Sequence, residues 1–152
     1  MSVTHATFTL ERTYPVPPAE VFAAWSDPAA KAAWFAGPDA GHRLDFRIGG
    51  HESCQGRAPG GDPLAFESVY RDIVPDERIV YSSTLSAGER LSTVSITTVE
   101  FVPAPDGTRL VLTEQGTFLD GMEQPQWREQ GTKDQLTTLA AVVRRSRQDM
   151  SS

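Results

Sequence analysis

The sequence predicts an α+β fold in which a curved antiparallel sheet of about seven strands wraps around a long terminal helix. Two observations carry this prediction. Residues 44–115 read as strands separated by turn residues, and a helical period replaces that pattern after Phe118. One helix can cover a single antiparallel sheet only if the sheet curls around it, and such an arrangement leaves a cavity between the two.

The part of the chain before the main sheet contains a strand and two short helices. Phe8 and Leu10 alternate with polar residues, which is the period of a half-buried strand. Pro18 suits the first turn of a helix because that turn needs no amide donor, and Asp27 is a typical cap for a second helix. The predicted elements are a strand over 6–14, a helix over 19–25 and a helix from Pro28 towards Trp34.

Turn residues divide the central part of the chain into further strands. The pair Asp106-Gly107 is the strongest hairpin signal because both residues tolerate positive φ. Residues 57–63 are rich in glycine and proline and are interpreted as a flexible lid loop near the cavity entrance. The predicted strands cover residues 43–48, 51–57, 64–74, 78–86, 91–102 and 108–116.

A terminal helix of about 20 residues is predicted after Asp120-Gly121, because apolar residues such as Leu136 and Val143 recur there at helical spacing. At about 100° per residue, Glu129 falls on the face of Leu136. A carboxylate on a face that packs against a sheet must be hydrated, paired or perturbed. Two interpretations stay open: Glu129 reaches the cavity, or the helix is out of register with this projection and Glu129 is solvated.

Trp127 lies about 180° from Leu136 in the same projection, so a continuous helix would expose it. Alternatively the segment is irregular, since Gly131 can break a helix. An exposed tryptophan at this position would indicate a contact with a second protein chain.

The composition is typical of one soluble domain. The 152 residues carry a net charge of −6, so a nucleic-acid partner is not expected. No apolar stretch is long enough for a membrane span. The single cysteine, Cys54, excludes an intrachain disulfide and fits a reducing compartment. We therefore expect a cytoplasmic protein with a single domain over residues 1–152.

Four short segments follow one another in a characteristic order. One is Ile73-Val74-Pro75-Asp76-Glu77-Arg78-Ile79-Val80-Tyr81, and the others are residues 14–25, 99–110 and 112–116. Together they resemble the START-like (SRPBCC) superfamily, in the branch similar to the activator of the heat-shock-protein ATPase, whose hairpin reads I-x-P-x-E-R-I/L-V-Y/F. The resemblance covers about residues 7–145 and implies a helix-grip fold with a hydrophobic cavity.

The resemblance also implies a function: binding of a small hydrophobic or amphipathic molecule, in metabolite handling or stress response. Two alternatives stay open, namely a cyclase- or hydrolase-type enzyme for a lipid- or polyketide-like substrate, and a protein-interaction module that contacts a chaperone. The branch has no shared catalytic motif, so no catalytic residues are assigned. No cofactor is expected, and a homodimer is the default for a small soluble protein.

Glu114 is the clearest candidate for a polar residue in the cavity. It shares a strand face with the apolar Leu110 and Leu112 and should point towards the helix. If Glu114 and Glu129 both reach the cavity mouth, they could act as acid and base, whereas the alternative is an ordinary structural role. The predicted ligand-binding residues are Trp34, Phe46, Tyr70, Tyr81, Glu114, Phe118, Glu129, Thr132 and Leu136.

His42, His51, Glu52 and Cys54 suggest a metal site, but their spacing matches no zinc pattern. In a strand, His51 and Glu52 point to opposite faces. We therefore expect no metal. A catalytic Cys54 would need a histidine beside it, and the sequence does not place one there.

Overall fold

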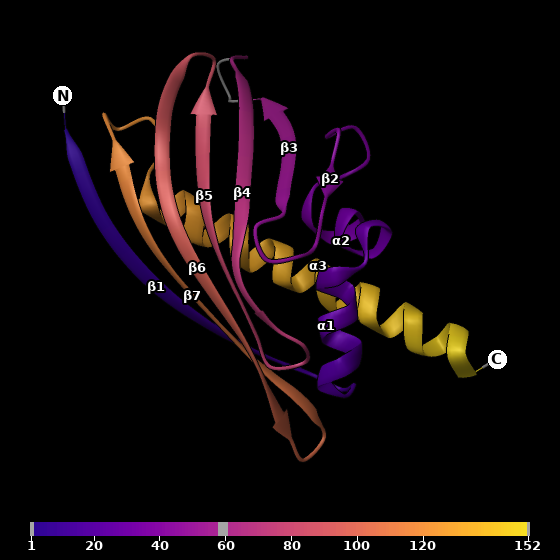
Figure 1. The fold of residues 1–152 in the computed structure, drawn as a ribbon. Coiled ribbons are helices and arrows are strands. Elements are labelled where there is room, and N and C mark those ends of the chain that lie inside the picture. The colour runs from indigo at the N-terminus through magenta and orange to yellow at the C-terminus, as the bar shows by residue number, and fades with distance from the viewer. Residues whose placement is uncertain (1, 58–60, 152) are drawn as a thin grey trace.

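The structure is a computed structural model that describes residues 2–57 and 61–151, with side chains up to residue 145. Its elements are β1 (Val3–Tyr14), α1 (Pro18–Ser26), α2 (Pro28–Phe35), β2 (Arg43–Leu44), β3 (His51–Arg57), β4 (Pro63–Val74), β5 (Arg78–Ala87), β6 (Arg90–Ala104), β7 (Gly107–Leu119) and α3 (Pro125–Ser151). Figure 1 shows that the strands form one curved sheet crossed by α3. The predicted α+β helix-grip class is confirmed.

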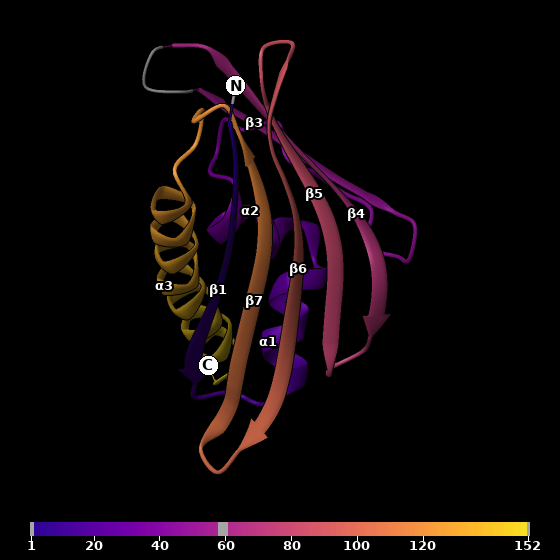
Figure 2. The ribbon, with the colours of Figure 1, turned by 90° about the vertical axis from the view of Figure 1, so that its left-hand side faces the viewer.

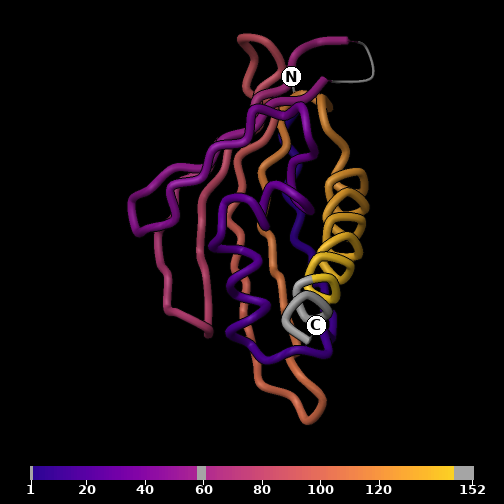
Figure 3. The backbone as a smooth tube through the Cα atoms, turned by 90° about the vertical axis from the view of Figure 1, so that its right-hand side faces the viewer, coloured from indigo at the N-terminus to yellow at the C-terminus, as the bar shows by residue number. Residues whose placement is uncertain are grey.

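The seven strands lie in the order β1-β7-β6-β5-β4-β3-β2 and are antiparallel throughout. Strands β2 to β7 form the predicted meander, and β1 pairs with β7 over its whole length, from Val3↔Leu119 to Tyr14↔Thr108. Figures 2 and 3 view the molecule from opposite sides, and in both α3 and the α1–α2 pair lie on the same face of the sheet. The space for a site is therefore enclosed between this face and the helices.

Most element boundaries lie within three residues of the predicted ones, and two elements differ more. The strand predicted over 43–48 is paired only at Arg43–Leu44, because from Asp45 the chain turns back, with the Gly50 amide donating to the Arg47 carbonyl. The terminal helix has 27 residues rather than about 20, and it runs through Gly131 without a break. Residues 58–60 of the predicted lid loop lie outside the described residues.

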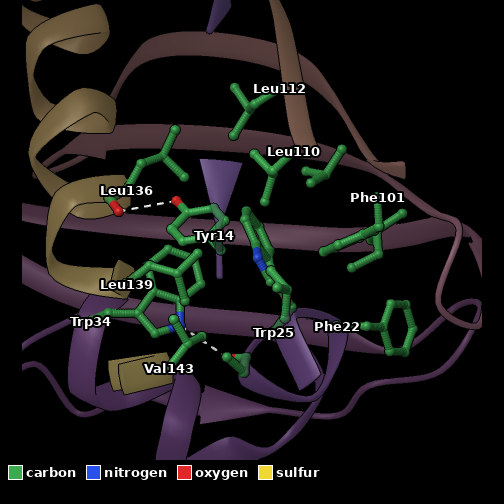
Figure 4. Packing of buried hydrophobic residues seen from close by; sticks show 14 of the residues in the cluster. Tyr14, Phe22, Trp25, Trp34, Phe101, Leu110, Leu112, Leu136, Leu139 and Val143 are labelled. Carbon is green, nitrogen blue, oxygen red and sulfur yellow. Dashed lines mark hydrogen bonds between the residues drawn. The ribbon is translucent and has the colours of Figure 1, made fainter. Parts of the chain in front are cut away.

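The core lies where α1, α2 and the second half of α3 pack on the sheet (Figure 4). Tyr14 joins β1 to α3, since its hydroxyl donates to the Leu136 carbonyl at 3.0 Å. Trp34 joins the two short helices, since its Nε1 donates to the Ala24 carbonyl at 2.9 Å. These bonds fix the rotation of α3 against the sheet and the position of α2 relative to α1.

Opposed side chains form rows across the helix-covered face of the sheet. One row is aliphatic and consists of Ile79, Val99, Leu112 and Leu10. The next row consists of Tyr70, Tyr81, Thr97 and Glu114. The register of four strands thus places a carboxylate next to an apolar row. Within the described residues, no helix combines the length and apolar character needed to cross a membrane.

Candidate ligand-binding pocket

A pocket of about 270 Å³ lies between the first half of α3 and the sheet. Helices α1 and α2 close it on one side, and β3, β4, β5 and β7 form its floor. Its lining consists of Trp25, Trp34, Phe35, Cys54, Phe66, Tyr81, Leu85, Leu112, Glu114, Glu123, Trp127, Arg128, Gly131, Thr132, Gln135 and Leu136. Most of these side chains are aromatic or aliphatic, and the charged ones are joined by hydrogen bonds in one cluster.

The charged cluster is built around Arg128. Its Nε and Nη2 donate to the two oxygens of Glu123 at 3.0 and 2.9 Å, and its Nη1 donates to Glu114 Oε2 at 3.3 Å. Threonines on β6 complete the cluster: Thr97 donates to Glu114 Oε1 at 2.9 Å, and Thr93 donates to Glu123 Oε1 at 2.7 Å. One guanidinium therefore serves two carboxylates in a partly buried setting.

Burial raises the pKa of Glu114 above its ordinary value, and the attraction of Arg128 and the hydrogen bond from Thr97 only partly oppose this. The pKa of Tyr81, its neighbour in the cross-strand row, is raised by burial and by the nearby Glu114. The Tyr81 phenol is therefore neutral at physiological pH. Its ring is a wall of the pocket with a polar hydroxyl and no charge.

A second polar cluster, here called the Lys31 cluster, lies behind the aromatic wall of the pocket. Lys31 and Glu52 are fully buried and form an ion pair at 3.0 Å. Glu52 also accepts from the Tyr70 hydroxyl at 2.8 Å and contacts His42 Nε2 at 2.7 Å. The Lys31 ammonium lies 4.3 Å from the centre of the Phe35 ring, and the rings of Trp25, Trp34 and Tyr81 lie within 6.0 Å of it.

These contacts compensate for the burial of two charges. Burial lowers the pKa of Lys31, and the Glu52 carboxylate opposes that shift. Burial alone would raise the pKa of Glu52, but Lys31, His42 and Tyr70 together lower it below its ordinary value. Burial also raises the pKa of the nearby Cys54 thiol to about 11, with Glu52 contributing. Cys54 is thus a protonated thiol on the pocket wall rather than an activated nucleophile.

Five of the nine predicted ligand-binding residues line the pocket: Trp34, Tyr81, Glu114, Thr132 and Leu136. The others lie elsewhere. Phe46 packs on Tyr70, with ring centres 4.9 Å apart, and Tyr70 is turned towards Glu52. The Phe118 ring covers Gly116 so closely that a Cβ at position 116 would lie 2.8 Å from Phe118 Cε1.

Glu129 does not lie in the pocket lining. Its side chain is 38% exposed and pairs with Lys133 at 3.4 Å. Of the two interpretations of Glu129, the structure supports the solvated one. The hypothesised acid–base pair of Glu114 and Glu129 is therefore wrong, because the partner of Glu114 on α3 is Arg128. Adjacent helical residues differ by about 100° in direction, so a small error in phase exchanges one side chain for the other.

Trp127 lies in the first turns of a continuous helix, so the alternative of an irregular segment broken at Gly131 is wrong. Its side chain is 61% exposed, as expected for the outer face, and it also forms part of the pocket lining. The tryptophan thus stands at the mouth of the pocket, between the interior and solvent.

Lys31, Glu123 and Arg128 were not predicted as site residues. Lys31 precedes Trp34 by three residues and therefore shares its face of α2, which is a signal that the sequence does contain. No comparable signal exists for the contact of Arg128 with Glu114, which depends on how α3 lies on the sheet. Among the described residues, no three His, Cys, Asp or Glu side chains are grouped as metal ligands.

The chain is similar to one protein family and to several solved structures. A family model described as Activator of Hsp90 ATPase homolog 1-like protein matches residues 15–144. An uncharacterized protein from Rhizobium leguminosarum is 42% identical with a TM-score of 0.89, over 95% of this chain and 97% of that chain. The Mll3558 protein from Rhizobium loti is 45% identical with a TM-score of 0.87, over 93% and 99% of the two chains. No functionally curated protein matches the sequence.

Proposed function

This chain belongs to the family of Activator of Hsp90 ATPase homolog 1-like proteins, and on that premise we propose that it binds a small amphipathic molecule in the pocket between α3 and the sheet. The bound molecule would be a metabolite that the protein holds or carries. The observation that carries the proposal is the composition of the pocket wall. Aromatic and aliphatic side chains supply most of it, and a single polar cluster lies within it, which is the usual composition of a small-molecule site.

Gly131 supports this proposal from the side of the helix. A glycine inside a helix lowers stability by roughly 0.5–1 kcal/mol relative to alanine. Gly131 lines the pocket, and a Cβ built there meets no atom within 4 Å. The missing side chain is therefore not required by packing within the protein. A large side chain at this position would occupy space at the mouth of the pocket.

The proposal is tested by thermal unfolding of the protein with a library of lipid-like and polyketide-like molecules. A ligand at about 100 times its dissociation constant stabilises the protein by about 2.7 kcal/mol, which shifts Tm measurably. We expect Gly131→Phe to reduce the shift by occupying the pocket mouth, and Gly131→Ala to retain it. A library without any stabilising member, or a shift that is equal in both variants, would contradict the proposal.

A second candidate function is a contact with a chaperone, as the description of the family suggests. The observation that favours it is the 61% exposure of Trp127. It predicts that the purified protein changes the ATPase rate of Hsp90 and that Trp127→Ala reduces this effect. The rate of Hsp90 alone is the control, and an unchanged rate in the presence of the protein would remove this candidate.

A further inference from the structure

The charged residues of the pocket wall do not balance. Glu114 and Glu123 each contribute one carboxylate, and Arg128 is their shared cation, at 2.9 to 3.3 Å. The Lys31–Glu52 pair behind the wall is neutral as a unit. When both pocket carboxylates are ionised, this part of the pocket therefore carries one negative charge in excess.

The unused hydrogen-bonding capacity of the cluster also favours a cationic ligand. Two ionised carboxylates offer about eight acceptor positions. Arg128, Thr93 and Thr97 occupy five of them. Arg128 has two N–H groups left, but its guanidinium already contacts both carboxylates, so an anion bound to it would meet repulsion from both. The open acceptor positions suit a donor with positive charge.

The aromatic residues around the pocket add to this preference. The faces of Trp25, Trp34, Phe35 and Tyr81 already surround the Lys31 ammonium on the inner side of the wall. The same four residues, with Phe66 and Trp127, line the pocket. Aromatic faces attract cations, and they attract them more strongly when water is excluded.

We propose that the ligand is an organic ammonium compound, with its cationic group held at Glu114 and Glu123 and its apolar part held between Leu112 and α3. This inference rests on the proposed function and adds the chemical class of the ligand. Carboxylate-bearing molecules such as free fatty acids are disfavoured, because their head group would be the third anion around one guanidinium.

The test uses three probes with the same alkyl chain: octylammonium, 1-octanol and octanoate. Their dissociation constants for the full chain are measured by calorimetry at pH 8, where Glu114 is more fully ionised. We expect octylammonium to bind about tenfold more tightly than octanol, the ratio that about 1.4 kcal/mol of electrostatic preference produces. Octanoate is expected to bind more weakly than octanol.

Glu114→Gln is expected to bring the ratio of octylammonium to octanol affinity close to one. Glu67→Gln removes the same charge from an exposed position of β4, on the face opposite to Phe66, and should leave the ratio unchanged. The inference is overturned if octanol or octanoate binds the wild type as tightly as octylammonium, or if both variants lower the ratio equally. If none of the three probes binds although a member of the library stabilises the protein, the inference fails and the proposed function stands; if neither the probes nor the library bind, both fail.

Discussion

The Lys31 cluster shows how one side chain can organise the wall of a pocket. Lys31 extends from α2 into the interior, where the Glu52 carboxylate and four aromatic faces receive its ammonium. Glu52 in turn orders Tyr70 and His42 through short hydrogen bonds. The ion pair thereby fixes the distance between α2 and β3. The rings of Trp34 and Phe35 on α2 line the pocket.

Glu52→Gln is expected to lower the free energy of unfolding by about 3–5 kcal/mol, since it leaves the Lys31 ammonium buried without a counter-charge. The glutamine keeps the volume and can still bond to Tyr70 and His42. Chemical denaturation measures the loss. The paired variant Lys31→Met with Glu52→Gln removes both charges and should regain a large part of it. If the paired variant is as unstable as Glu52→Gln alone, the loss of stability does not come from an unpaired Lys31 ammonium.

Glu114 predicts a pH dependence of stability with a definite sign. Its pKa is raised in the folded protein, so the native state holds this proton at pH values where the unfolded chain has released it. The contribution of Glu114 to stability is therefore greatest below pH 4.5, the ordinary pKa, and is lost as pH rises through the raised pKa. The unfolding free energy of the wild type minus that of Glu114→Gln should fall over this range. A difference that is constant or that rises with pH would contradict the assignment.

The identities of these residues were predictable to different degrees. Glu114 was found because strand alternation assigns a face with a period of two, and Leu110 and Leu112 define the inner face. The choice between Arg128 and Glu129 could not be made in this way. The rotation of α3 is set by tertiary contacts such as that of Tyr14 with the Leu136 carbonyl, which join distant parts of the sequence.

Helix α3 contains a pocket-lining glycine at a position where helix propensity favours alanine. Gly131→Ala is expected to raise the free energy of unfolding by about 0.5–1 kcal/mol, because alanine has the higher helix propensity and the site has open space. Denaturant titration or calorimetry measures this change.

Gly88→Ala is the matched control, since that position also has open space but has φ of +59°. The same substitution should there lower stability by about 1 kcal/mol, because alanine is strained in the left-handed region. If both substitutions change the free energy of unfolding in the same direction, the proposed role of backbone conformation at these two glycines is wrong.

Most elements could be predicted because their signals are local. The prolines, the Asp27 cap and the turn pairs all act within a few residues, and the Asp27 carboxylate does accept from the Ala30 amide at 2.9 Å. The segment at 43–48 was predicted less well. Only two of its residues pair with β3, because the chain turns back from Asp45 and the Gly50 amide donates to the Arg47 carbonyl.

At the scale of the whole molecule, the sheet curves around α3 (Figure 1). The pocket lies between the sheet and the first half of α3, and α1 and α2 close it on one side. The order of strands and helices was sufficient to predict this arrangement. The charged cluster was not predictable, because it joins β6, β7 and α3 across gaps that no local pattern spans. The sequence therefore predicts the fold well, but it does not predict which charged side chains meet in the site.

A crystal structure of the protein grown with octylammonium would show whether the pocket binds an organic cation. We expect the alkyl chain to lie between Leu112 and α3 beneath Trp127, with the nitrogen within hydrogen-bond distance of Glu114 or Glu123. A pocket that stays empty in that crystal, or a probe bound only on the outer face of the sheet, would contradict it.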